Sequence, residues 1–70
     1  MQNLVSYTDL NGHTVENILA SSPAEHKRLV IRTTVFKTNV LCEYVIYHNN
    51  IVSSVCPQLW SAVKEYNQIK

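Results

Sequence analysis

Short runs of apolar residues, separated by polar ones, fill the middle of the chain from position 27 to position 56. This stretch is dense in Val, Ile, Thr, Tyr and Phe, which suit a pleated, half-buried surface. Polar residues interrupt it at positions 37–39 and again at Asn49 and Asn50, and Asn tolerates the positive φ angles of tight turns. The pattern predicts three antiparallel strands, at residues 28–36, 40–48 and 51–56.

Two-residue loops at positions 38–39 and 49–50 would fix how these strands pair. The opposite pairs predicted in this way are Phe36 with Leu41, Val35 with Cys42, Arg32 with Val45, His48 with Ile51, Ile46 with Ser53, and Tyr44 with Val55.

Because side chains alternate across a sheet, this register also predicts two faces. The first face, better suited to a core, gathers Leu29, Ile31, Val35, Cys42, Tyr44, Ile46, Ile51 and Val55. The second face gathers Val30, Arg32, Thr34, Phe36, Leu41, Glu43, Val45, Tyr47, Val52 and Ser54. The second face has a polar centre, yet it carries more apolar surface than a solvated face needs.

The segments before the first long strand are short. Residues 2–8 include the β-prone run LVSYT and could add a fourth strand at an edge of the sheet. Residues 14–22, TVENILASS, place apolar side chains at helical spacing and predict a two-turn helix docked on the sheet. Ser22, Pro23 and Glu25 have the spacing of a capping box, which predicts a short helical turn there.

The end of the chain, PQLWSAVKEYNQIK, predicts a helix that begins at Pro57. Its apolar stripe, which should lie across the first face, consists of Leu59, Ala62, Val63, Tyr66 and Ile69. Trp60 lies off the centre of this stripe, so it is either an interface anchor or core filler, depending on its exposure.

Together these elements predict a single α+β domain over residues 1–70. We expect a small antiparallel sheet of three to four strands, with a short N-terminal helix and a C-terminal helix packed on one face. A chain this short buries roughly 60% of its unfolded surface, which leaves little room for an enclosed active site.

Composition narrows the function classes. Six basic residues against five acidic ones give a formal net charge of +1, which provides no electrostatic argument for nucleic acid or a membrane surface. No apolar run is long enough to span a bilayer, and the first residues lack the features of a secretory signal. We therefore expect a cytoplasmic protein.

The residues that could carry chemistry form no motif. His13, His26 and His48 match no metal-ligand spacing, and no serine lies in a nucleophile elbow. Cys42 and Cys56 are expected to point to opposite faces and to remain free thiols. We expect no catalytic residue, no cofactor and no metal.

The second face is the best candidate for a binding surface, because apolar anchors around a few charges suit protein association. Together with Trp60, the candidate partner-binding residues are Arg32, Phe36, Glu43 and Tyr47. An alternative use of the same aromatics with Arg32 is to stack nucleic-acid bases, although the sparse positive charge disfavours it.

The tract at residues 47–67, YHNNIVSSVCPQLWSAVKEYN, runs from a strand through a tight Asn turn and a second strand to a helix that ends in AV-x-x-YN. It resembles the tail of many small phage-encoded proteins. The resemblance implies a protein that binds and blocks a larger host protein, including a defence complex such as CRISPR. It carries over no residue role.

The sequence thus leads to three hypotheses. The first is a small non-enzymatic protein-binding module, an inhibitor or regulator that binds a larger host protein. Either this partner or a second copy of the chain, in a homodimer, would cover the second face or an edge strand. The second is a small nucleic-acid-binding protein, and the third is a minor enzyme or metal-dependent factor.

Overall fold

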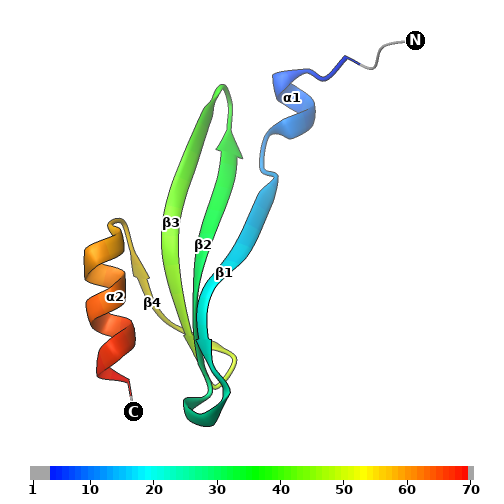
Figure 1. Cartoon of the computed structure of the whole chain (residues 1–70). Helices are drawn as coiled ribbons and strands as arrows, with labels where there is room; N and C mark the ends of the chain where they lie inside the picture. Colours follow the sequence, from blue (N-terminus) through cyan, green and yellow to red (C-terminus); the bar gives the residue numbers. More distant parts are fainter. Residues whose placement is uncertain (1–3, 70) are drawn as a thin grey trace.

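The computed structural model describes residues 4–69, which form one four-stranded antiparallel sheet in the order β1-β2-β3-β4 with a helix packed on it (Figure 1). The elements are α1 (Tyr7–Leu10), β1 (Thr14–Ser22), the 3-10 turn η1 (Pro23–Glu25), β2 (Lys27–Phe36), β3 (Asn39–His48), β4 (Ile51–Cys56) and α2 (Leu59–Gln68). The predicted α+β class, with a short N-terminal helix and a C-terminal helix, is confirmed.

The short helix and the fourth strand have exchanged places relative to the prediction. Residues 14–22 form β1 instead of a helix, and residues 7–10 form α1, which Ser6 and Asp9 cap reciprocally. The described part of the predicted fourth strand, residues 4–8, contains no strand, and positions 2 and 3 lie outside the described residues. An isolated two-turn helix gains little in water, whereas β1 pairs along its length with β2.

The predicted helical turn is confirmed as η1. Ser22 Oγ donates to Glu25 Oε1 at 2.7 Å, but no side chain caps the backbone of the turn. His26, with φ of 55°, then adopts the left-handed conformation and ends the turn.

The β2–β3 turn lies one residue earlier than predicted. Its two residues are 37 and 38, and Lys37 has φ of 58°, so Phe36 pairs with Asn39 and not with Leu41. The whole register is therefore displaced by two residues, and Arg32 faces Glu43 instead of Val45. A displacement of two leaves every side chain of these strands on its predicted face.

The Asn49-Asn50 turn is confirmed, with both residues at positive φ and His48 opposite Ile51. The pairing predicted beyond Tyr47 and Val52 is wrong, because an irregularity at Ser53 sets Ile46 opposite Ser54 and Tyr44 opposite Cys56. A one-residue shift exchanges the faces of a strand. Ser54 therefore joins the first face, and Val55 joins the second.

The bulge also corrects the argument about the cysteines. Cys56 pairs with Tyr44 and therefore shares the first face with Cys42. Both are free thiols, Cys42 exposed and Cys56 buried. The expectation of free thiols agrees with the structure, but the reason given for it, opposite faces, is wrong.

The core lies between the first face and α2, which packs against β2, β3 and β4. It consists of Leu29, Ile46, Cys56, Ala62 and Tyr66, with Ala20, Tyr44 and Ile69 partly buried beside them. The predicted apolar stripe of α2 is therefore correct for Ala62 and Tyr66, which are buried. It is wrong for Leu59 and Val63, which are exposed.

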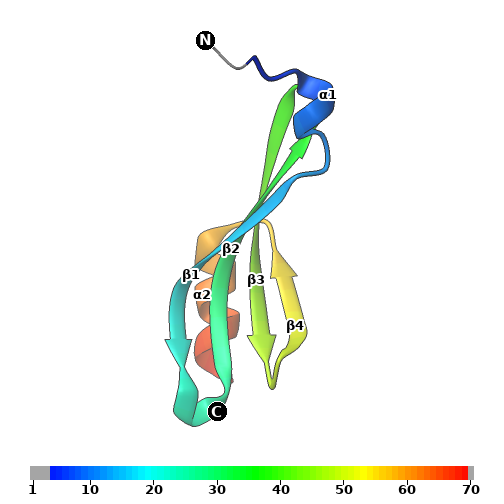
Figure 2. The ribbon, with the colours of Figure 1, turned by 90° about the vertical axis from the view of Figure 1, so that its right-hand side faces the viewer.

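The molecule is elongated, with principal extents of 50 × 22 × 17 Å. Its radius of gyration of 14.9 Å exceeds the value of about 11 Å expected for a compact chain of this length. Figure 2 shows why: α2 lies behind one half of the sheet, and the β2–β3 hairpin and α1 extend beyond it. Much of the sheet is thus exposed on both faces.

Candidate functional site

The second face of the sheet is the side opposite α2, and the observed register defines its members. They are Thr14, Glu16, Ile18 and Ser21 from β1, Arg28, Val30, Arg32, Thr34 and Phe36 from β2, Leu41, Glu43, Val45 and Tyr47 from β3, and Val52 and Val55 from β4. Within residues 4–69, no helix packs on this side. We keep the name second face for this set.

The middle of the second face is buried by its own side chains. Val30 is 2% exposed and Val45 is fully buried. Tyr47 Oη donates to Glu16 Oε2 at 2.8 Å. Tyr47 lies on β3 and Glu16 on β1, so the two residues flank β2, where Val30 lies between their pairing partners Arg28 and Arg32. The tyrosine side chain therefore crosses the sheet above Val30 and shields it from water.

A network of charged side chains surrounds this crossing. Arg32 Nη2 donates to Glu43 Oε1 at 3.2 Å, and Arg32 Nη1 lies 3.9 Å from Glu16 Oε2. The Arg28 guanidinium lies 4.3 Å from the centre of the Tyr47 ring. Exposed ion pairs of this kind contribute at most about 1 kcal/mol each. Their main effect is to hold two arginines and two glutamates in a fixed, charge-balanced arrangement.

The same contacts set the protonation of the tyrosine. The hydrogen bond to the Glu16 carboxylate raises the pKa of Tyr47, and desolvation raises it further. Tyr47 therefore stays protonated at neutral pH and acts as a donor to Glu16. This role is structural and gives the face a rigid polar centre.

Apolar side chains surround the polar centre. Five of them are exposed although they are large: Ile18, Phe36, Leu41, Val52 and Val55. They come from all four strands, so the apolar surface extends across the full width of the sheet.

The structure brings four of the five candidate residues to one face. Arg32, Glu43 and Tyr47 belong to the central network, and Phe36 lies toward the β2–β3 turn. Trp60 is exposed but belongs to α2, on the other side of the sheet, where its indole N–H donates to Gln58 Oε1. It is therefore not part of the second face.

Sequence reasoning missed Glu16, Ile18 and Arg28. The two β1 residues were missed because their segment was predicted to be helical. A usable signal was present in TVENILASS, whose Val, Ile and Thr content also suits a strand. Arg28 was assigned to a strand, but its stacking on Tyr47 follows only from the pairing of β2 with β3.

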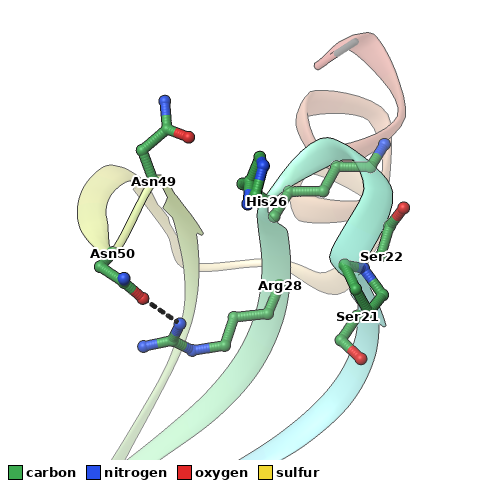
Figure 3. Close-up of a pocket in the computed structure, with 8 residues that line it drawn as sticks. Ser21, Ser22, His26, Arg28, Asn49 and Asn50 are labelled. Carbon is green, nitrogen blue, oxygen red and sulfur yellow. Dashed lines mark hydrogen bonds between the residues drawn. The ribbon is translucent and has the colours of Figure 1, made fainter.

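A shallow cavity of about 200 Å³ lies at the end of the sheet that carries η1 and the β3–β4 turn (Figure 3). Its labelled lining residues are Ser21, Ser22, His26, Arg28, Asn49 and Asn50. Arg28 Nη1 donates to Asn50 Oδ1 at 3.1 Å across it. Arg28, a member of the second face, is thus held by Asn50 of the β3–β4 turn, and this hydrogen bond fixes the position of the guanidinium above Tyr47.

No group of three or more His, Cys, Asp or Glu side chains among residues 4–69 could hold a metal ion. The helices of that region are too short or too polar to cross a bilayer.

Comparison with protein-family models, with curated proteins and with solved structures finds no match to this chain. The second face, with its balanced charges and exposed apolar side chains, is therefore the observation from which a function has to be inferred.

Proposed function

We propose that the protein is a small non-enzymatic binding module that holds a larger protein against its second face. The observation that carries this proposal is the uncovered sheet face, where five large exposed apolar side chains surround a balanced charge network. Apolar anchors with a few fixed polar groups between them are typical of protein interfaces.

The size of the face supports the proposal. The strands have nine, ten, ten and six residues. With a rise of about 3.3 Å per residue and a spacing of about 4.8 Å between strands, the face covers roughly 550 Å². Standard protein interfaces bury about 800 Å² on each partner. The second face, with the side chains at its margins, therefore approaches the lower end of this size class.

The charge pattern favours protein over nucleic acid as the partner. Arg32 forms ion pairs with Glu16 and Glu43. Arg28 donates a hydrogen bond to Asn50 and stacks on the ring of Tyr47. The face therefore offers little uncompensated positive charge, which is the main source of affinity for a phosphate backbone. The same residues suit a protein interface, where Arg and Tyr are common among the residues that dominate affinity.

The likeness of residues 47–67 to the tails of small phage-encoded proteins supports a host protein as the larger partner. On this proposal the protein acts in the cytoplasm of the host cell. It would occlude a functional surface of its target, for which a defence complex such as CRISPR is one candidate.

Paired double variants test the proposal. Phe36→Ser with Leu41→Ser removes two apolar side chains from the second face, whereas Val15→Ser with Val40→Ser removes two exposed ones from the opposite face. We expect the first pair to weaken partner capture at least about tenfold, or about 1.4 kcal/mol, because such anchors dominate interface affinity.

The measurement is quantitative capture by tagged protein from the cells that produce it, with a thermal melt of each variant. The opposite-face pair should retain partner capture, and the two melting temperatures should be similar. Equal loss from both pairs, or no loss from either, would contradict the proposal.

A further inference from the structure

The outer edge of β1 is open along most of its length. Gly12 N–H donates to Val35 O at 2.7 Å and Val35 N–H donates to His13 O at 2.9 Å, so Val35 directs both backbone groups toward β1. Because this direction alternates along a strand, Val15 and Asn17 also bond toward β2. The N–H and C=O groups of Glu16 and Ile18 are therefore directed outward.

This edge lacks the features that protect edge strands. At the other edge of the sheet, β4 has only six residues, contains the irregularity at Ser53 and is followed by Pro57. By contrast, β1 pairs regularly from Thr14 to Ile18 before its own bulge, and it contains no Lys, Arg or Pro.

The single charge of β1 does not protect the edge either. The Glu16 carboxylate is held over the second face by Tyr47 and Arg32. Beside the open backbone lie three exposed apolar side chains, Val15, Ile18 and Leu19. A strand with these properties is a template for pairing with another strand.

We propose that a second copy of this chain pairs with β1 in an antiparallel arrangement, with a two-fold axis at Asn17. This inference does not depend on the proposed function, because it rests on the outward backbone groups of β1 and not on a partner bound over the second face. Antiparallel pairing of identical strands is symmetric, so each copy satisfies the outward backbone groups of the other. The result is a sheet that continues from one copy into the next.

The register follows from two constraints. Residues with outward backbone groups must face each other, and within β1 before its bulge these are Thr14, Glu16 and Ile18. A register centred on Val15 would carry the pairing past Thr14, the first residue of β1, so the remaining choices use Glu16 and Ile18. Facing Glu16 with its own copy would oppose like charges, and facing Ile18 with its own copy would continue the pairing into the bulge. The Asn17-centred register opposes no like charges and completes its central pairs before the bulge, because Glu16 of each copy faces Ile18 of the other and Asn17 faces Asn17.

The exposed area of the chain agrees with a second copy. The accessible surface is 5345 Å², whereas a compact monomer of 8.0 kDa is expected to expose about 4,450 Å². The difference is comparable to the roughly 800 Å² that each partner buries in a standard interface. Pairing through β1 would also place the two second faces side by side on the same side of the joined sheet.

Cysteine cross-linking tests the register directly. Asn17→Cys, in a Cys42→Ser background that removes the exposed thiol, would place two sulfhydryl groups opposite each other at the two-fold axis. Facing residues there belong to a non-hydrogen-bonded pair with Cα atoms about 4.5 Å apart, which a disulfide can span. The matched control is Thr38→Cys, exposed in the turn at the other end of β2.

We expect most of the Asn17→Cys protein, and little of the Thr38→Cys protein, to become a linked dimer under mild oxidation. Light scattering should give wild-type protein twice the 8.0 kDa mass of one chain, and Ile18→Lys, at an exposed position, should restore the monomer mass without lowering the melting temperature. A monomeric wild type, or equal linkage at both positions, would overturn the proposal. A wild type that stays monomeric while its β1 edge pairs with a different protein would overturn it as well.

Discussion

Replacing Ala62 by aspartate is expected to lower the free energy of unfolding by more than about 3 kcal/mol, the largest effect of any substitution considered for this protein. Ala62 is fully buried at the centre of the contact between α2 and the sheet, beside Leu29 and Ile46. A carboxylate there would be desolvated within an apolar cluster. Domains of this size are stabilised by only about 4–10 kcal/mol, so much of the protein would unfold.

The matched control is the neighbouring substitution Val63→Asp. Val63 is 39% exposed, so its carboxylate would remain hydrated and should lower the free energy of unfolding by less than about 1 kcal/mol. Denaturant titrations of the two variants, followed by circular dichroism, measure the difference. Comparable losses of stability would mean that α2 packs on the sheet through a different side.

Replacing Lys27 by methionine is expected to have the second-largest effect, a loss of about 2–3 kcal/mol. Lys27 begins β2 and is buried, and its ammonium donates to the backbone oxygens of Tyr66 at 2.9 Å and Ile69 at 3.0 Å. It thereby satisfies carbonyl groups at the end of α2 and places a positive charge at the negative end of the helix dipole.

Methionine retains the apolar length of the lysine side chain but lacks the ammonium, so both carbonyl groups would lose their charged donor. The ammonium also lies 4.3 Å from the centre of the Tyr66 ring, a contact that would be lost with it. The control is Lys64→Met on the exposed side of α2, which should change the free energy of unfolding by less than about 0.5 kcal/mol. The account of Lys27 fails if both variants unfold at the same denaturant concentration.

The strands β2, β3 and β4 could be predicted from the sequence, because they are rich in Val, Ile, Thr and Tyr and polar turn residues separate them. The turn after Phe36 was placed one residue late, since three consecutive polar residues allow two different loops. The error left the faces intact because it displaced the register by two. The bulge at Ser53 was beyond prediction, as two adjacent serines give no signal for which of them leaves the pairing.

The segment before η1 was predicted wrongly for a different reason. Its apolar spacing fits a helix as well as a strand, and the choice was made by long-range pairing with β2, which local pattern does not contain. Glu16 was therefore missing from the predicted site, although Arg32, Glu43 and Tyr47 were assigned to one face. The contact of Lys27 with α2 likewise joins residues far apart in sequence.

The central claim, that the second face binds another protein, is tested most directly by site-specific photo-crosslinking. A photoreactive side chain is introduced at Leu41 on the second face or at Val40, its neighbour on β3, which points to the opposite face. The two positions are 52% and 60% exposed, so both probes meet solvent equally well. The account predicts a crosslink to a larger protein from Leu41 and none from Val40, whereas equal crosslinking from both positions, or crosslinking from Val40 alone, would contradict it.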